Sequence, residues 1–314
     1  MKNLIPFLLL LLLVLVSCSP VESDSPVGLI PAPLINADNY PRLDGSTSAE
    51  PILAQITCNF MQVPCEWMEW LGGDRRLVPN LTNSVGQFSS FNTSGTHEAY
   101  VNLIAEQADL ILVARAPSQD ELQLASDSGV HLDVQPVALD AFVFIVNEDN
   151  PVDGLSSDQI RQIYSGKLAN WSEVGGTEAE IHAYQRDENS GSQELMQELV
   201  MRGRRMIDAP NLVLPAMFAP FYAITEDPDG IGYSVYFYEQ NMAPLAERTK
   251  LIAVDGIHPD AKSISTREYP YTTEVFAVTR GDLPEDSLAY QLRDWLLSPG
   301  GQALVEESGY VPID

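Results

Sequence analysis

The sequence predicts an α/β fold that is divided into two lobes. Apolar, strand-like segments alternate with amphipathic, helix-like segments along the body of the chain, and this order is typical of α/β proteins. The chain has 314 residues, and the part that follows an N-terminal leader is still longer than one compact core usually is. We therefore expect two lobes, each with a core of its own.

Three apolar segments are predicted as strands. Residues 108–114 form a short apolar run, residues 137–147 form a longer one, and residues 275–279 form a third. The first two runs are apolar almost without interruption, which suits parallel strands buried on both faces. We expect the regions 137–147 and 271–279 to cross between the lobes.

The two crossing strands imply that one lobe is built from both ends of the body. This lobe is expected to contain residues 38–138 and 271–314, and the middle segment, residues 139–270, forms the other lobe. The space between two such lobes is a natural place for a small ligand.

Helix signals lie between these strands. Ser156 is a favourable N-capping residue, and Ile160 and Ile163 follow it on one predicted helix. A Ser-Pro-Gly-Gly sequence at 298–301 ends an amphipathic segment near the C-terminus. The helices are expected at residues 97–107, 156–164, 192–206, 287–297 and 300–309.

The N-terminus has the features of a secretory signal peptide, residues 1–17. A basic start is followed by an apolar stretch that is shorter than the ~20 residues a transmembrane helix needs. The sequence Leu-Val-Ser-Cys that ends at Cys18 resembles a bacterial lipobox, in which cleavage precedes the cysteine and the cysteine is lipidated. The alternative is an ordinary signal peptide with an incidental cysteine.

Residues 18–37 are rich in Pro, Ser and acidic side chains and have little apolar periodicity. Such a segment cannot bury enough surface to offset its ordering entropy, so we interpret it as a flexible lipidated tether. These features predict an extracytoplasmic lipoprotein that is anchored to a bacterial membrane.

Acidic side chains dominate the charge. The 44 Asp and Glu residues outnumber the 17 Lys and Arg residues, and the formal net charge is −27. Nucleic-acid binding requires a basic face, so nucleic acid is not an expected partner. We interpret the charge as a contribution to solubility.

Two cysteines, Cys58 and Cys65, could form a disulfide outside the cytoplasm. In one continuous helix their Cα atoms would lie about 10 Å apart, which is too far for a bridge. Pro64 is expected to break the helix and let the two meet, but two free buried thiols are an open alternative. No histidine lies near them in the sequence and no Cys-x-x-Cys pair occurs, so no metal site is expected.

Two loops are rich in hydroxyl groups and precede helical segments. The first contains Thr47 and Ser48, and the second contains Thr93 and Ser94. Unpaired N–H groups at a helix N-terminus, together with hydroxyl donors, can bind an anion. Taken alone, each loop is better explained as a helix cap with nothing bound.

A third loop adds a positive charge to the same chemistry. Arg186 lies four residues before Ser190, which opens a helix together with Gly191 and Ser192. The planar guanidinium carries its donors in a fork that matches an oxyanion. The alternative is a surface arginine paired with one of the two acidic residues that follow it.

Arg115 is a further candidate for the same site. It directly follows the strand predicted at 108–114, and ligands of doubly wound sheets bind at the carboxyl ends of strands. A structural ion pair explains Arg115 equally well.

The order of these loops and of several further motifs resembles the phosphate-binding proteins of ABC importers. The most distinctive match is Ile-Tyr-Ser-Gly-Lys at 163–167, followed by Asn-Trp-Ser-Glu-Val-Gly-Gly at 170–176. Gly-Ile-Gly-Tyr at 230–233 and the Ser-Pro-Gly-Gly-Gln and Gly-Tyr-Val-Pro sequences near the C-terminus agree with it. The resemblance covers most of the body of the chain.

The resemblance implies a type 2 periplasmic-binding-protein fold, in which each lobe is a mixed sheet flanked by helices and two hinge strands join the lobes. It implies a monomeric solute-binding lipoprotein, without a cofactor, that captures phosphate or a similar oxyanion for an ABC permease. The expected ligand-binding residues are Thr47, Ser48, Thr93, Ser94, Arg115, Arg186, Ser190, Gly191 and Ser192.

One departure from the family pattern concerns the choice of anion. Many members have Ser-Asp-Ala-Pro where this chain has Ala-Arg-Ala-Pro at 114–117, although a related branch also carries Arg. In the family, that Asp accepts the proton of bound hydrogen phosphate, whereas an arginine cannot accept a hydrogen bond. Ser48 also replaces a common aromatic residue. The sequence therefore supports an oxyanion ligand more strongly than it supports phosphate.

Other functional classes find little support. The chain has no Gly-x-Ser-x-Gly elbow and no His-Glu-x-x-His motif, and the glycine that a P-loop needs upstream of Lys167 is missing. An enzyme is therefore not expected. The alternative is a sensor or adhesion lipoprotein that kept the fold but lost transport, which the departures at Arg115 and Ser48 bring into consideration.

Overall fold

The computed structural model describes residues 30–70, 73–81 and 90–313, and the structural statements below concern these residues. Its main sheet has the strand order β1-β4-β13-β5-β10-β7, and β11 and β14 also pair with β5. The strands of this sheet are β1 (Leu43–Gly45), β4 (Leu110–Val113), β5 (Leu132–Asn147), β7 (His182–Ala183), β10 (Gly230–Val235), β11 (Thr249–Leu251), β13 (Thr272–Arg280) and β14 (Val311–Pro312).

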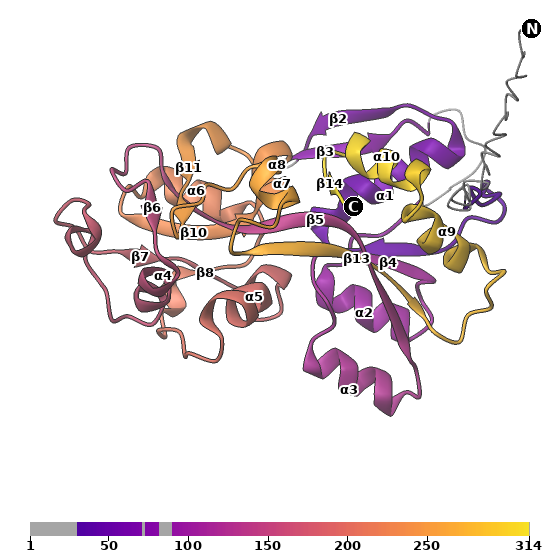
Figure 1. Ribbon diagram of the computed structural model, residues 1–314, viewed down its shortest axis with the longest axis horizontal. Coiled ribbons are helices and arrows are strands. Elements are labelled where there is room, and N and C mark those ends of the chain that lie inside the picture. Colours follow the sequence, from indigo (N-terminus) through magenta and orange to yellow (C-terminus); the bar gives the residue numbers. More distant parts are fainter. Residues whose placement is uncertain (1–29, 71–72, 82–89, 314) are drawn as a thin grey trace, which may run out of the picture.

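Strand β5 belongs to both halves of the molecule, which lie side by side in Figure 1. Up to Ala141 it pairs with β13, and Ala138 and Leu139 also pair with β14. From Phe142 onward it pairs with β10 and β11 instead. β5 and β13 run together through the middle of the molecule, where the sequence predicts the crossing strands (Figure 1).

The parallel direction predicted for the apolar strands is wrong for β5. This strand is antiparallel to each of its partners β10, β11, β13 and β14. Parallel pairing occurs elsewhere in the sheet, between β1 and β4 and between β10 and β7. Residues 137–147 are all buried, so their uninterrupted apolar run reflects burial on both faces and not strand direction.

Helices flank the sheet on both faces. In the first half, Figure 1 shows α1 and α10 on one side of the sheet and α2 and α3 on the other. The helices of this half are α1 (Glu50–Met61), α2 (Thr96–Ile104), α3 (Gln119–Asp127), α9 (Leu288–Leu296) and α10 (Pro299–Glu307). Those of the second half and the linking region are α4 (Ser157–Tyr164), α5 (Gly191–Leu195), α6 (Ala219–Glu226), α7 (Tyr236–Asn241) and α8 (Ala261–Ser265).

Most predicted helices form close to their expected limits, and one does not. Ser156 caps α4 as predicted, since its side chain accepts a hydrogen bond from the backbone N–H of Gln159. The helix expected at 192–206 is shorter, because α5 ends at Leu195 and continues as a π-helix, Met196–Met201. Arg202 then adopts a left-handed conformation with φ of 49°, which ends the helix.

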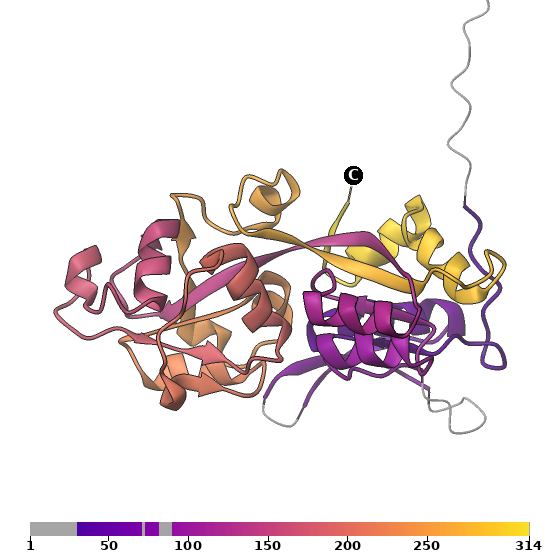
Figure 2. The same cartoon turned by 90° about the horizontal axis from the view of Figure 1, so that it is seen from below.

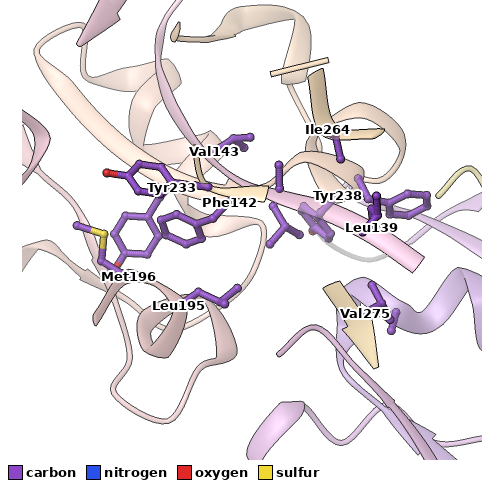
Figure 3. Close-up of a cluster of buried hydrophobic side chains, with 14 of the residues drawn as sticks. Leu139, Phe142, Val143, Leu195, Met196, Tyr233, Tyr238, Ile264 and Val275 are labelled. Atoms are coloured by element: carbon purple, nitrogen blue, oxygen red, sulfur yellow. The ribbon is translucent and has the colours of Figure 1, made fainter. Parts of the chain in front are cut away.

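A continuous apolar core surrounds β5 and extends into both halves. The ring of Phe142 on β5 lies 5.2 Å from the ring of Tyr233 on β10, and Figure 3 shows the two side by side. Leu195 and Met196 of the α5 region belong to the same buried cluster (Figure 3). This core positions α5, and with it the loop that precedes α5.

The predicted disulfide between Cys58 and Cys65 is confirmed. Helix α1 ends at Met61 and Gln62 adopts a left-handed conformation, so the chain reverses before Cys65 begins strand β2 (Cys65–Glu69). The two cysteine Cα atoms lie 5.7 Å apart, and their sulfurs are bonded. The bridge ties α1 to a hairpin of β2 and β3 (Arg75–Pro79), which reaches toward the second half in Figure 2.

The predicted signal peptide, Cys18 and most of the predicted tether lie outside the described residues. The tether was expected to continue to residue 37, but Pro33 and Ile35 are buried and Ile35 is part of the core. The chain therefore packs against the body a few residues earlier than expected. Within the described part, no helix is both long enough and apolar enough to cross a membrane.

Candidate functional site

A cavity of about 560 Å³ lies between the two halves of the molecule. Among the residues expected to bind a ligand, those that line it are Thr47, Ser48, Ser94, Arg186, Ser190, Gly191 and Ser192. Thr93 and Arg115 are not part of its lining. The structure therefore brings three of the four predicted loops together around one space.

The first loop is held close to the sheet by a glycine. A Cβ atom at Gly45 would lie 2.3 Å from the carbonyl oxygen of Leu112, so only glycine fits at the end of β1. Ser46 then donates its backbone N–H to the same oxygen, and a 3₁₀ turn, Thr47–Ala49, leads into α1. The backbone carbonyl of Ser48 accepts a hydrogen bond from the buried hydroxyl of Tyr310. The loop is thus fixed from the core side and presents its other side to the cavity.

The second loop is tied to the first by Asp44. The buried carboxylate accepts hydrogen bonds from the backbone N–H groups of Gly45 and Ser94, from the Ser94 hydroxyl and from the Asn102 amide, at 2.7–3.0 Å. Because Ser94 donates its hydroxyl proton to Asp44, that proton is not directed at a ligand. Thr96, which begins α2, lines the cavity beside Ser94 and was not predicted from the sequence.

Arg186 in the third loop is a buried cation without an acidic partner. The residue belongs to strand β8 (Gln185–Arg186) and is only 7% exposed. The guanidinium donates to the carbonyl of Leu214 at 3.0 Å and to the sulfur of Met217 at 3.3 Å, and within the described residues no carboxylate pairs with it. The surface ion pair considered as an alternative for Arg186 is therefore not what the structure shows.

The environment of Arg186 also affects its acid–base equilibrium. Burial lowers the pKa of Arg186, and the nearby Tyr233, Tyr238 and Asp187 act in the opposite direction with smaller effect. A buried charge of this kind is costly unless it is compensated. An anion in the cavity could supply the missing compensation.

The turn before α5 brings the two halves into contact. Ser190 caps the helix by accepting a hydrogen bond from the backbone N–H of Gln193 at 3.1 Å. A Cβ atom at Gly191 would lie 2.5 Å from the hydroxyl oxygen of Thr96, which belongs to the other half. The Ser192 hydroxyl lies 3.7 Å from the Met217 sulfur, so Met217 faces two donors of the cavity wall.

Arg115 does not take the position that the sequence suggested. It is 1% exposed and forms a two-pronged ion pair with Glu121 of α3, with both N–O distances at 2.7 Å. Its guanidinium also pairs with Glu194 of α5 in the second half. Glu121 is placed there because it is part of the capping box of α3 with Ser118. Arg115 therefore acts in a structural ion-pair network that links the halves, and it does not face the cavity.

Several lining residues were not predicted from the sequence. Asp74 and Arg76 reach the cavity from the β2–β3 hairpin, and Met217, Phe218 and Tyr238 reach it from the second half. None of them lies in a glycine–hydroxyl loop, which was the signal used to find the others. Among the described residues, no group of three or more His, Cys, Asp or Glu side chains could hold a metal ion.

Sequence comparison finds relatives that are less than 30% identical to this chain. The Phosphate-binding protein PstS of Bacillus subtilis (strain 168) is 28% identical over 178 residues, which cover 56% of each chain. The protein of the same name from Staphylococcus saprophyticus is 28% identical over 235 residues, which cover 71% of each chain.

Solved structures show the same fold. A putative phosphate ABC transporter substrate-binding protein from Clostridium perfringens, solved with bound phosphate, has a TM-score of 0.67 at 21% identity, covering 87% of this chain and 99% of that one. An ABC-type phosphate transport receptor from Vibrio cholerae has a TM-score of 0.63 at 20% identity, covering 86% and 98%. The family model of the PBP superfamily domain matches residues 75–299, which is more than half of the chain, and the chain therefore belongs to the PBP superfamily.

Proposed function

We propose that this chain is an extracytoplasmic binding protein that captures phosphate for an ABC importer. The observation that carries the proposal is Arg186, a buried guanidinium without a carboxylate partner on the wall of a cavity between the two halves. The printed names of the relatives and the phosphate bound to the Clostridium perfringens protein support phosphate as the anion.

The lining supplies the donors that an oxyanion needs. Arg186 and Ser192 both face the sulfur of Met217, which is a weak acceptor. A phosphate oxygen is a stronger acceptor, and charge-assisted hydrogen bonds to it are roughly twice as strong as neutral ones. We infer that the anion takes the place of the sulfur against these two donors. Thr47 and Ser48 of the first loop and the N-terminal turn of α2 complete the donor set from the other half.

Capture proceeds by closure of two lobes, which we assign to residues 38–138 with 271–314 and to residues 139–270. β5 and β13 are the hinge strands. Contacts between Gly191 and Thr96 and between Arg115 and Glu194 form only when the lobes approach, so they favour the closed state. The anion adds to this preference because it binds donors from both lobes.

The strong negative charge of the chain does not oppose this proposal. Charges separated by more than ~8–10 Å are largely screened at physiological salt. Local donors and the charge of Arg186 therefore decide whether the anion binds.

The remaining parts of the proposal concern the context of the protein. We propose that lipidated Cys18 anchors a monomer at the outer face of a bacterial membrane and that an ABC permease receives the ligand. We also propose that the protein binds its ligand without converting it, because the cavity lining supplies hydrogen-bond donors for an anion. The departure at Arg115 does not favour a sensor or adhesion protein, since Arg115 lies outside the cavity lining.

Titration calorimetry of the Arg186→Ala variant tests the binding role. The wild type is expected to bind phosphate, and the variant is expected to lose about 2–5 kcal/mol of binding free energy because a buried charge partner is removed. Arg204→Ala is the matched control, since Arg204 is half-exposed and pairs with Asp158 at the surface. Equal phosphate affinity of Arg186→Ala and the wild type would place the site elsewhere.

A further inference from the structure

The carboxylate of Asp74 has an unusual position on the wall of the same cavity. Asp74 directly precedes β3, is 2% exposed and lines the cavity together with Arg186. Its Oδ2 atom lies 3.4 Å from the Nε atom of Arg76. Its Oδ1 atom is buried and has no hydrogen-bond partner among the described residues. One oxygen of the carboxylate therefore lies in an ion pair with Arg76, and the other has no partner among the described residues.

The neighbours of Asp74 keep this arrangement in place. Arg76 is engaged by Glu50 at 2.7 Å, so it is fixed between two carboxylates. The backbone carbonyl of Asp74 accepts a hydrogen bond from Trp70 at 2.8 Å across the hairpin. The backbone N–H of Arg75 donates to the carbonyl of Met242 in the second half at 2.8 Å. The position of Asp74 thus depends on both halves of the molecule.

Tyr238 connects Asp74 with the cation of the site. Tyr238 lines the cavity, and its hydroxyl is buried without a hydrogen-bond partner among the described residues. Burial raises the pKa of Tyr238, the Asp74 carboxylate raises it further, and Arg76 and Arg186 lower it. Asp74 and Arg186 therefore both lie close enough to act on the same phenol.

The chemistry of a carboxylate limits what can lie against Oδ1. A carboxylate only accepts hydrogen bonds. A tetrahedral anion without a proton also presents only acceptors, so the two would repel each other. Hydrogen phosphate carries an O–H group that can donate, whereas sulfate at neutral pH has no proton to donate. Arg115 cannot supply this selection, because a guanidinium has no acceptor and Arg115 lies outside the lining.

We propose that Asp74 determines the specificity of the cavity for protonated oxyanions by accepting a hydrogen bond from the ligand's hydroxyl. This inference rests on the proposed function, namely that the cavity binds an oxyanion. Under this proposal, a residue of the β2–β3 hairpin discriminates against sulfate. The disulfide Cys58–Cys65 links this hairpin covalently to α1.

Calorimetry at neutral pH with phosphate, arsenate and sulfate tests the proposal. Phosphate and arsenate both keep a proton there, and sulfate does not. The wild type is expected to bind phosphate and arsenate at least about tenfold more tightly than sulfate. A tenfold loss of affinity corresponds to the free-energy cost of leaving a buried polar group without a suitable partner. In Asp74→Asn the phosphate-to-sulfate ratio is expected to fall about tenfold, chiefly because sulfate binds more tightly to the amide donor.

Glu69→Gln is the charge-matched control. Glu69 is an exposed carboxylate on β2 that does not line the cavity, so removing its charge is expected to leave the ratio within about twofold. An unchanged ratio in Asp74→Asn, or an equal change in Glu69→Gln, would overturn the inference. If Asp74→Asn does not fold, the affinities of the wild type for the three anions test the inference. Equal affinities of the wild type for phosphate and sulfate would also overturn the inference.

The same experiment separates the two proposals. A wild type that binds none of the three anions contradicts the proposed function itself. A wild type that binds phosphate and sulfate equally well leaves the anion site in place and removes only the role of Asp74.

Discussion

Asp140 is a fully buried carboxylate in the strand that both halves share. Its Oδ1 atom accepts hydrogen bonds from the backbone N–H groups of Ala141 at 2.8 Å and Phe237 at 3.0 Å. Its Oδ2 atom has no partner among the described residues. Burial raises the pKa of Asp140 to about 7, and the two backbone hydrogen bonds lower it by less.

The raised pKa of Asp140 makes stability depend on pH in a definite direction. Between the usual Asp value of 3.8 and about 7, the folded protein holds a proton that the unfolded chain releases. The free energy of unfolding contributed by this group therefore falls as pH rises through that window, by up to about 1.4 kcal/mol per pH unit. Above pH 7 the buried charge remains a cost.

Asp140→Asn is therefore expected to be more stable than the wild type at pH 8 and similar to it near pH 4. The amide oxygen keeps the two backbone hydrogen bonds and carries no charge. Urea unfolding of both proteins at several pH values measures the difference, and Asp38→Asn serves as a control at an exposed carboxylate. A difference that does not change with pH would show that Asp140 does not titrate in this range.

Gly191 governs how closely two elements, α2 and α5, can approach. The hydroxyl oxygen of Thr96 would lie 2.5 Å from an added Cβ atom, which is closer than real Cβ contacts allow. The Cβ atom of Thr96 would also lie only 3.2 Å away, so rotation of the Thr96 side chain alone does not relieve the crowding. A larger residue at 191 is therefore expected to hold the two halves farther apart.

Gly191→Ala is expected to weaken phosphate binding about tenfold, equivalent to about 1.4 kcal/mol, with little change in thermal stability. Calorimetry measures the first and thermal unfolding measures the second. Gly300→Ala is the control, since its added Cβ would meet only ordinary contacts at 3.5 Å. Adding Thr96→Ala to Gly191→Ala should restore part of the phosphate affinity. Unaltered phosphate binding in Gly191→Ala would argue against a close approach of α2 and α5 in the bound state.

At the scale of the whole molecule, an ion pair between Arg115 and Glu194 connects the two halves. Arg115 is buried with Glu121 on one side, while Glu194 comes from the other half. Burial raises the pKa of Glu194, and Arg115 lowers it. This contact replaces the ligand contact that the sequence suggested for Arg115. If the two lobes close as proposed, the ion pair favours the closed form.

Small-angle X-ray scattering tests the closure of the two lobes. Phosphate is expected to reduce the radius of gyration of the wild type, because the anion binds donors from both lobes. Without phosphate, Glu194→Gln is expected to have a larger radius of gyration than the wild type, since the ion pair across the halves is weakened. Identical scattering of the wild type with and without phosphate would contradict the clamp.

Much of the fold follows from local sequence patterns. Ser156 caps α4, the apolar runs give β4, β5 and β13, and Pro64 accompanies the reversal that brings Cys58 and Cys65 together. These features depend on neighbours in the chain, so propensity and capping suffice to predict them. The parallel direction was wrong for β5, because the partners of a strand come from distant parts of the chain. The helix expected at 192–206 forms but ends at Met201, after a π-helical turn.

The sequence by itself predicted the α/β class and the glycine–hydroxyl loops, and it named Arg186 as a candidate to bind the ligand, since each of these predictions uses only residues close together in the chain. Tertiary structure alone decided that Arg115 pairs with Glu121 and Glu194 and that Asp74 faces the cavity. The physical reason is that the role of a charged side chain depends on which groups surround it. Those groups come from segments far away in the sequence, and only the folded chain brings them together.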